Sequence, residues 1–272
     1  MEAALQRRIQ RYGWDKAAIH YEVFWHQQLK PAQDKLLELA NPKSGEKLID
    51  IACGTGLVSF RAAEKLGESG FVLATDISDN MVRIGNELAA QKNYTNIRFA
   101  RMDAEELNIA DDEFDISSSA LGLMYVPDPA RALQEMYRVI TPGGRAVAAV
   151  WGQRSRCGWA EVFEIIDRRV ASEVCPLFFN LGNNDVLKRR FEGAGFSKVH
   201  FERLNTELIY DSDEDACGAA FSGGPVALAY NKFDDQVKNE VHQEYLESIR
   251  SFKRGNGYAV PGEFVVAIGY RR

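Results

Sequence analysis

The 272-residue sequence has few of the features that mark secreted, metal-binding or membrane-spanning proteins. It contains four cysteines, Cys53, Cys157, Cys175 and Cys217, and because none of them forms a C-x-x-C pair, no spacing indicates a zinc site. No stretch approaches the roughly 18 apolar residues of a membrane span, and the first 13 residues are too polar for a signal peptide. The sequence therefore predicts a cytoplasmic protein with reduced, free thiols, no metal and no membrane span.

The sequence also lacks an excess of positive charge. The formal net charge is −6 and the sequence pI is about 5.4, whereas a protein that binds nucleic acid unaided normally carries a basic face. Two small arginine clusters, Arg7, Arg8 and Arg11 in one and Arg271 and Arg272 in the other, are interpreted as solvated chain ends. No nucleic-acid partner is expected.

The composition is that of a globular protein with an ordinary core. Apolar residues make up 46% of the chain and charged residues 26%, a mix typical of folded soluble domains. The length suits one large α/β domain, or one domain with an appended lid, and is sufficient to bury a full core.

Between Lys47 and Trp151, short apolar runs alternate with amphipathic segments. The runs predict strands at Leu48–Ile51, Phe71–Thr75, Ile97–Ala100, Phe114–Ser118 and Ala146–Trp151. Helices are expected after Gly56, after Ser78 and from Asp128 to Ile140, where Thr141-Pro142-Gly143-Gly144 ends the last one. Strands that alternate with helices at this spacing predict a doubly wound, mostly parallel sheet.

The flanking regions are less regular. One helix is predicted over Trp14–Leu29 and a second from Pro31, a residue that suits a first helical turn. Beyond Trp151 the pattern predicts helices near 160–170, 185–192 and 234–252. It predicts strands at Val199–Leu204, possible again at Leu208, and at Phe264–Tyr270.

The strongest functional signal is the segment Leu48-Ile49-Asp50-Ile51-Ala52-Cys53-Gly54-Thr55-Gly56. Its two glycines allow a tight turn and a close approach of the backbone to a ligand, and the next helix points its free N–H groups into the crevice at the strand ends. Asp50, Asp76 and Asp103 each lie at the end of a successive predicted strand. In a parallel sheet, all three carboxylates are expected to face that crevice.

From Lys47 to Trp151 this arrangement resembles the class I S-adenosylmethionine-dependent methyltransferases. The resemblance implies a Rossmann-like fold with a seven-stranded sheet, an antiparallel last strand and a helical lid. It assigns the methionine portion of the cofactor to the turn, the ribose hydroxyls to Asp76, and the adenine to Asp103 and to the ring contacts of Ile77 and Met81. The complete set of cofactor-binding residues that we expect is Tyr21, Asp50, Ala52, Cys53, Gly54, Gly56, Asp76, Ile77, Met81, Asp103, Ala104, Ser119 and Leu121.

The resemblance also implies how the single domain, 1–272, is organised. Residues 1–45 form a helical lid, 46–151 the cofactor-binding core, and 152–272 an acceptor-binding half with inserted helices at about 211–258. The segments Asp111-Asp112-Glu113-Phe114-Asp115 and Val126-Pro127-Asp128-Pro129 are similar to those of quinone C-methyltransferases and related small-molecule enzymes. The implied activity is methyl transfer from S-adenosylmethionine to a small molecule by in-line displacement.

Two other functions remain open at this point. A nicotinamide-binding Rossmann domain requires a small residue three positions after the second glycine, where Ser59 is an imperfect match. Asp50 would also repel a pyrophosphate, whereas a cofactor that carries a sulfonium and an ammonium tolerates it. A non-catalytic S-adenosylmethionine-binding subunit would have the same fold.

The acceptor is expected to be small and partly apolar. The regions outside the core carry aromatic residues that could line a closed pocket, and Tyr21 and Trp25 lie one helical turn apart. The aromatic candidates are Trp14, Tyr21, Phe24, Trp25, Tyr125, Phe178, Phe179, Phe221, Tyr230 and Phe233. His20, His26, Tyr125 and His242 are possible bases, but none lies in a motif, and the sequence identifies neither a catalytic residue nor an oligomeric state.

Overall fold

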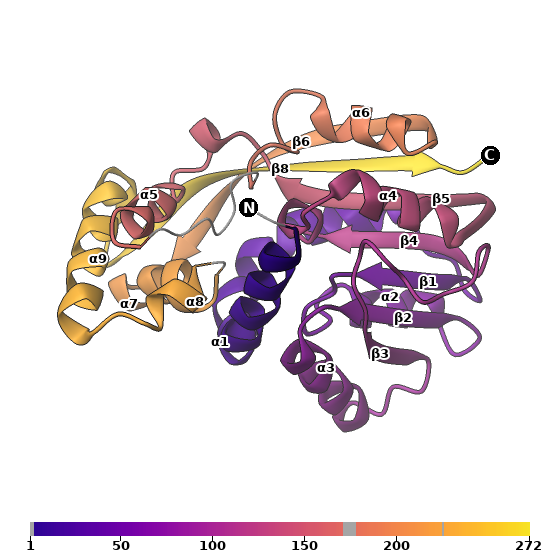
Figure 1. The fold of residues 1–272 in the computed structure, drawn as a ribbon, viewed down its shortest axis with the longest axis horizontal. Helices are drawn as coiled ribbons and strands as arrows, with labels where there is room; N and C mark the ends of the chain where they lie inside the picture. Colours follow the sequence, from indigo (N-terminus) through magenta and orange to yellow (C-terminus); the bar gives the residue numbers. More distant parts are fainter. Residues whose placement is uncertain (1–2, 171–177, 225) are drawn as a thin grey trace.

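The computed structural model describes residues 3–170, 178–224 and 226–272, and its centre is a mixed β-sheet. The strand order is β3-β2-β1-β4-β5-β8-β6, and the two-residue β7 pairs only with β8. The bounds are β1 Lys47–Ile51, β2 Phe71–Asp76, β3 Ile97–Arg101, β4 Phe114–Ala120, β5 Ile140–Trp151, β6 Ser197–Tyr210, β7 Lys253–Arg254 and β8 Gly257–Tyr270. Figure 1 shows the sheet at the centre of the molecule.

The pairing confirms the predicted fold class. Strands β1 to β5 are parallel to their neighbours, and β8 runs antiparallel between β5 and β6. Seven strands form the continuous path, as expected, with β8 as the antiparallel last strand. Parallel strands need crossover connections, and these connections bring the carboxyl ends of β1 to β5 to one edge of the sheet.

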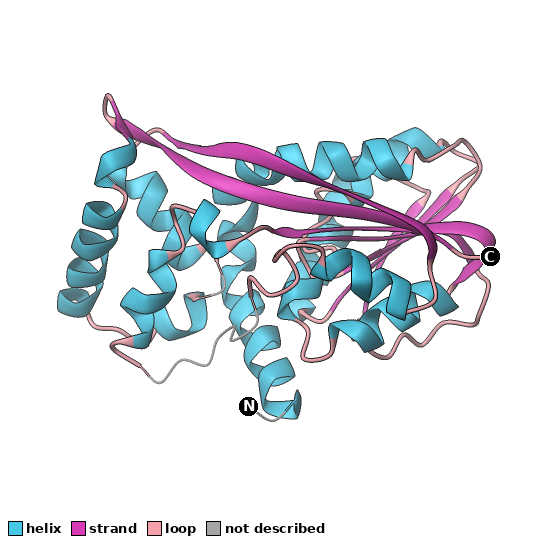
Figure 2. Ribbon diagram, turned by 90° about the horizontal axis from the view of Figure 1, so that it is seen from above, coloured by secondary structure: helices cyan, strands magenta, loops and turns pink. Residues whose placement is uncertain are grey.

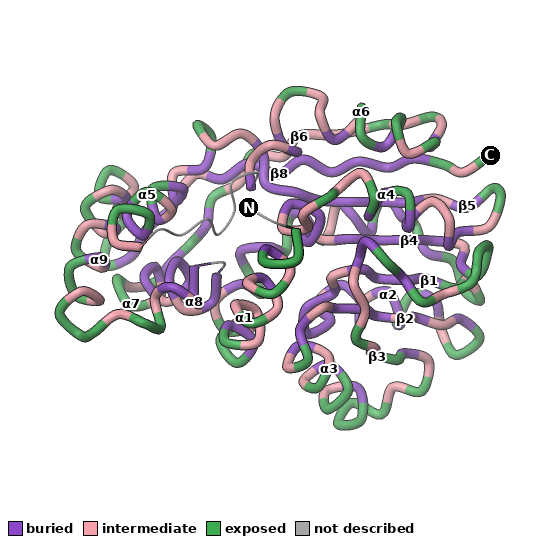
Figure 3. The backbone as a smooth tube through the Cα atoms, in the orientation of Figure 1, coloured by how far each residue is buried: buried purple, intermediate pink, exposed green. Residues whose placement is uncertain are grey.

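Helices cover both faces of the sheet. The helix α1 (Ala3–Ala40) packs beside α3 (Asp79–Gln91), α2 (Ser59–Leu66) packs against β1 to β3, and α4 (Pro129–Arg138) packs beside α6 (Val186–Gly193). Right-handed crossovers place α2 and α3 on one face. Because both faces are covered, strands such as β1 are buried almost throughout, which Figure 3 shows for the centre of the sheet.

The N-terminal region forms one helix, so the prediction of two helices separated at Pro31 is wrong. Helix α1 runs for 38 residues with Pro31 inside it. An internal proline costs a helix roughly 3 kcal/mol because it removes a hydrogen bond and crowds the preceding turn. Leu29, Ala32 and Leu36 are buried on either side of Pro31, and their packing offsets this cost.

The C-terminal strands are longer than the sequence pattern predicts. We expected Val199–Leu204 with a resumption at Leu208, and Phe264–Tyr270. The resumption is confirmed, because Leu208 pairs with Val260, but β6 and β8 pair over a much longer stretch. Figure 2 shows the two long strands side by side, extending beyond the parallel strands. The sequence pattern does not indicate this pairing, because β6 contains many polar residues and β8 contains Pro261. Similarly, β5 begins at Ile140, which we had placed in the preceding helix.

The extended strands carry a group of helices at the end of the molecule opposite α6 (Figure 1). The predicted helices near 160–170, 185–192 and 234–252 are confirmed as α5, α6 and α9. The bounds in this region are α5 Glu161–Asp167, α7 Asp213–Cys217, α8 Ala227–Tyr230 and α9 Asp235–Ser248. The short turns are η1 Leu123–Tyr125, η2 Arg154–Arg156, the π-helical η3 Gly218–Ser222 and η4 Arg250–Phe252.

Candidate functional site

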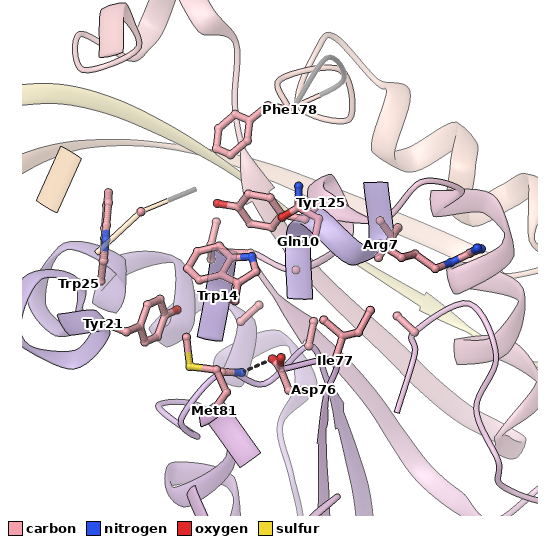
Figure 4. A pocket seen from close by; sticks show the side chains of 18 of the residues that line it. Arg7, Gln10, Trp14, Tyr21, Trp25, Asp76, Ile77, Met81, Tyr125 and Phe178 are labelled. Carbon is pink, nitrogen blue, oxygen red and sulfur yellow. Dashed lines mark hydrogen bonds between the residues drawn. The ribbon is translucent and has the colours of Figure 1, made fainter. Parts of the chain in front are cut away.

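A pocket opens at the carboxyl ends of the parallel strands, beneath α1. One end of it is lined by residues that follow β1 to β4, among them Gly54, Asp76, Asp103 and Leu121. This is the crevice in which open α/β sheets bind ligands. In Figure 4, Asp76 and Met81 lie at one end of the pocket and Phe178 at the other, with Trp14 and Tyr125 between them.

The turn after β1 approaches the pocket at Gly54. Gly54 has a φ of +58°, and a Cβ built on it would lie 3.3 Å from the ring of Tyr21 on α1. Gly56, with a φ of +103°, does not line the pocket. A Cβ built on it would lie 2.6 Å from the ring of Phe99. The two glycines therefore serve different purposes: Gly54 makes room at the ligand site, and Gly56 makes room for core packing.

Two non-glycine residues of this edge also have a left-handed backbone. Ala52 has a φ of 55° and Leu121 a φ of 62°, and both line the pocket. Such residues carry local strain, which in folded proteins is concentrated at functional sites. Both were on the list of expected cofactor contacts.

Asp76 is the buried carboxylate of the pocket. Its Oδ2 accepts a hydrogen bond of 2.8 Å from the Gly54 N–H, and its Oδ1 one of 2.9 Å from the Ser78 N–H. A carboxylate has about four acceptor positions, so these two bonds leave acceptor capacity for a hydroxyl donor. Burial raises the pKa of Asp76 to about 6, although backbone hydrogen bonds from Ser78, Gly54 and Ile77 favour its ionised form.

Asp50 does not face the pocket, which corrects the expectation of three carboxylates in one crevice. Its side chain accepts hydrogen bonds from the hydroxyls of Ser59 (2.6 Å) and Ser118 (2.8 Å), so it ties the first turn of α2 to β4. Burial raises its pKa to about 6. Cys53, Gly56 and Ser119 are likewise absent from the lining, whereas the other nine expected residues line the pocket, including Tyr21, Ile77, Met81 and Ala104.

Helix α1 is fastened over the pocket by polar contacts. Arg7 forms ion pairs with Asp103 (3.1 Å from Nε to Oδ2) and Glu105, and Arg11 forms one with Asp79. For Arg7 and Arg11 these contacts correct the interpretation of the cluster as a solvated chain end, whereas Arg8 is exposed as expected.

Two further contacts lie along the same helix. The Asp15 carboxylate accepts a hydrogen bond of 2.6 Å from the Ser78 hydroxyl, and Glu22 accepts one of 2.8 Å from Thr55. Helix α1 therefore contacts the segments that follow β1, β2 and β3.

All four tryptophans of the chain line this pocket. Trp14 and Trp25 come from α1, Trp151 from the end of β5, and Trp159 from the segment before α5. Of the expected aromatic residues, the lining includes Trp14, Tyr21, Trp25, Tyr125 and Phe178, but not Phe24, Phe179, Phe221, Tyr230 or Phe233. We did not predict Trp151 or Trp159, although the position of Trp151 at a strand end was a usable signal.

The described lining contains no histidine or glutamate. His20 and His26 are exposed, and His242 lies 2.9 Å from the Tyr230 hydroxyl, in a cluster that does not line the pocket. Tyr125 is the only one of the four possible bases in the described lining. Within the described ranges, no group of three or more potential ligands could hold a metal ion, and no helix is long and apolar enough to cross a membrane.

Comparisons with known proteins agree on one family. A model described as the ubiE/COQ5 methyltransferase family matches residues 17–210. A demethylmenaquinone methyltransferase of Bacillus velezensis is 36% identical over 141 residues, which cover 52% of this chain and 60% of that protein. One of Staphylococcus carnosus is 32% identical over 187 residues, covering 64% of this chain and 77% of that protein.

Solved structures agree on the fold. A putative methyltransferase from Bacillus halodurans superimposes with a TM-score of 0.61 at 20% identity, covering 88% of this chain and 98% of that chain. A phosphoethanolamine N-methyltransferase from Haemonchus contortus, solved with S-adenosylhomocysteine, has a TM-score of 0.62 at 17% identity. The match covers 95% of this chain and 58% of that chain.

Proposed function

Because the chain belongs to the ubiE/COQ5 methyltransferase family, with S-adenosylmethionine as its methyl donor, we propose that it methylates a small, partly apolar ring compound. The observation that carries this proposal is the division of the pocket. One end is formed by strand-end residues and the buried Asp76 carboxylate, and the other by aromatic side chains that include Trp151 and Trp159. A flat apolar acceptor fits such aromatic walls.

The residues at the strand ends fit the cofactor. Asp76 would accept hydrogen bonds from the two ribose hydroxyls, because its two carboxylate oxygens can each accept more than one hydrogen bond. Ile77 and Met81 would contact the adenine ring, and Asp103 and Ala104 its amino edge. The backbone at Ala52 and Gly54 would pass close to the methionine portion. When bound, the cofactor supplies an electrophilic methyl group on its sulfonium.

Four expected residues would act indirectly. Asp50, Cys53, Gly56 and Ser119 do not line the pocket, and we propose that they shape the turn and the end of β4 around the cofactor. The acceptor end would then hold the nucleophilic atom in line with the methyl group and exclude water, which is the main task in this kind of displacement.

A defined acceptor tests the proposal. We expect label from methyl-labelled S-adenosylmethionine to enter an organic-extractable product when the protein is incubated with 1,4-naphthoquinol, a two-ring quinol chosen because the relatives are demethylmenaquinone methyltransferases. A matched reaction with the Asp76→Ala variant controls for label that arises without the enzyme. No transfer to this or any other ring compound, by protein that binds S-adenosylhomocysteine, would favour a non-catalytic binding subunit.

We also propose that α1 is a lid over the pocket. Its support is that Arg7, Asp15 and Glu22 hold α1 to the strand ends, while Tyr21 and Trp25 line the pocket. A cofactor bound in the crevice should reduce local opening of this helix. The backbone amides around Tyr21 should therefore exchange their hydrogens more slowly when S-adenosylhomocysteine is bound. Hydrogen-exchange mass spectrometry measures this, and α9 serves as an internal reference. Equal exchange around Tyr21 with and without ligand would contradict a lid role.

The pH dependence of cofactor binding should follow Asp76. Burial disfavours the ionised form of this carboxyl and therefore raises its pKa to about 6. The cost of the charge to the stability of the folded protein grows as the pH rises through about 6. The ribose hydroxyls need the ionised carboxylate as acceptor. Affinity for S-adenosylhomocysteine should therefore fall below pH 6, approaching about tenfold per pH unit.

Calorimetric titrations between pH 4.5 and 7.5 measure this dependence, and Asp76→Asn, which cannot titrate, should flatten most of it. An identical profile in the variant would exclude Asp76 as the controlling group.

The remaining expectations are consistent with this function. We propose that the protein acts in the cytoplasm and that its acceptor is not a nucleic acid. The unpaired thiols of Cys53, Cys157 and Cys217 support a reducing compartment. Cys175 lies outside the described residues.

A further inference from the structure

Exposed apolar side chains are concentrated on helix α1. Among the residues that the structure describes, six large apolar side chains are exposed, and four of them, Leu5, Tyr12, Ile19 and Val23, lie on this helix. Ile19 is 67% exposed and Val23 is 77% exposed. Single exposed apolar residues are normal on a protein surface, whereas a contiguous group of them indicates an interaction site.

The four side chains form one stripe along the helix. Successive members are seven, seven and four residues apart, and these spacings place them on the same side of an α-helix. From Leu5 to Val23 the stripe is about 27 Å long, at 1.5 Å per residue. The opposite side of the helix, with Trp14 and Tyr21, lines the pocket. Figure 2 shows the N-terminal turns of α1 projecting beyond the neighbouring helices.

The side of the helix that carries the stripe is also basic. Between residues 3 and 30, the exposed side chains include Arg8 and Lys16 but no carboxylate. Neither cation forms an ion pair with another described residue. The two acidic residues of this stretch, Asp15 and Glu22, are half-buried and accept hydrogen bonds from the segments that follow β2 and β1. A protein with a net charge of −6 therefore presents a local surface that is apolar and positive.

We propose that this face of α1, the apolar stripe with Arg8 and Lys16, docks on the surface of an anionic lipid bilayer. Helices that lie in a membrane interface combine apolar side chains, which reach the acyl boundary, with Lys and Arg, which are attracted to anionic headgroups. The inference goes beyond the proposed function, because it concerns the side of α1 that faces away from the pocket and does not depend on the identity of the acceptor.

The charges favour a bilayer over a second copy of the chain. Pairing of this face with itself would bring the Arg8 and Lys16 side chains close to like charges, and no exposed carboxylate between residues 3 and 30 would compensate them.

The stripe itself favours a bilayer over a nucleic acid or an acidic protein. A phosphate backbone would attract the two cations but would leave Ile19 and Val23 in water, and the net charge of −6 would repel it. A protein partner would need a groove that matches a projecting helix, whereas a fluid bilayer adapts to the shape of the helix.

Flotation with lipid vesicles tests the proposal. Wild-type protein saturated with S-adenosylhomocysteine is mixed with vesicles of phosphatidylcholine that contain about one-third phosphatidylglycerol, or with vesicles of phosphatidylcholine alone. We expect at least about tenfold tighter binding to the anionic vesicles, and added salt should weaken it. The double variant Ile19→Ser/Val23→Ser and the variant Lys16→Glu should each weaken binding to the anionic vesicles about tenfold.

Two matched variants at another edge of the molecule serve as controls. Lys198 is exposed at the start of β6, and Tyr270, which is 37% exposed, lies beside it at the end of β8. Lys198→Glu and Tyr270→Ser make the same kinds of change there and should bind the anionic vesicles like the wild type. Calorimetry should give all variants the wild-type affinity for S-adenosylhomocysteine, because none of the substituted residues lines the pocket.

The outcomes are separable from those of the proposed function. Wild-type protein that binds S-adenosylhomocysteine but does not float, or stripe variants that float like the wild type, would overturn the docking surface and leave the methyltransferase assignment intact. A wild-type dimer that Ile19→Ser/Val23→Ser converts into a monomer in sedimentation, without flotation of either protein, would overturn it in favour of a second copy. Flotation of wild-type protein that does not bind S-adenosylhomocysteine would overturn only the proposed function.

Discussion

Asp76→Ala is expected to weaken binding of S-adenosylhomocysteine at least tenfold, and about 100-fold if both ribose hydroxyls use the carboxylate. Hydrogen bonds to a charged group contribute roughly 1.5–3 kcal/mol each, and each 1.4 kcal/mol is a factor of ten in affinity. The variant also loses the hydrogen bond from the Gly54 N–H to the Asp76 carboxylate, and this bond holds the turn beside the ligand. Isothermal calorimetry measures the effect.

The control is a carboxylate of similar chemistry at a distance from the pocket. Asp111 lies on the surface in an ion pair with Arg138, and Asp111→Ala should bind S-adenosylhomocysteine like the wild type. If Asp76→Ala folds and keeps its affinity, Asp76 does not hold the ribose.

Substitution of the two turn glycines should have different consequences. Gly54→Val places a branched side chain within about 3.3 Å of Tyr21 at the pocket wall, so it should abolish detectable binding of S-adenosylhomocysteine in a protein that still folds. Gly56→Val would drive a side chain into Phe99 and Phe60. Overpacking of a core costs typically 1–3 kcal/mol, so this variant should first show a lower melting temperature.

Gly143→Val is the matched control for backbone strain. Gly143 has a φ of +87° but no heavy atom within 4 Å of a built Cβ, so this variant shows the cost of a positive φ without a steric clash. Thermal melts and calorimetry on all three variants separate folding from binding. Normal binding by folded Gly54→Val would mean that the turn does not approach the cofactor.

The strand-end part of the pocket was predictable because its signals are local. A strand, a glycine turn and a strand-end carboxylate follow one another within a short segment, and parallel pairing fixes where their ends meet. The positions of Gly54, Asp76 and Asp103 in the lining follow from that pattern. The distinction between Gly54 and Gly56 does not, because it depends on where the Phe99 ring packs.

Features that depend on distant contacts were missed. The pattern at Pro31 indicates a break, but burial of the flanking residues keeps α1 continuous. The pairing of Glu207 with Pro261 joins segments whose local sequence is too polar or too proline-bearing to indicate a long strand. Asp50 was misplaced because its orientation depends on the hydroxyls of Ser59 and Ser118.

The aromatic end of the pocket was predictable in kind but not in detail. An aromatic-rich pocket followed from the many rings outside the core, yet no local pattern says which of them share one cavity. Trp25, Trp151 and Trp159 meet only because α1 crosses the end of β5 next to the segment before α5. The rings around Phe221 and Tyr230 pack with His242 instead.

The central claim, methylation of a small apolar acceptor, is tested most directly by offering one enzyme preparation three classes of acceptor. Total RNA, total protein and a small-molecule extract are each incubated with methyl-labelled S-adenosylmethionine, and the label is counted in each fraction. We expect label in the small-molecule extract, in its organic-soluble part, and background in RNA and protein. Label in RNA or protein with none in the extract would contradict the account of the acceptor.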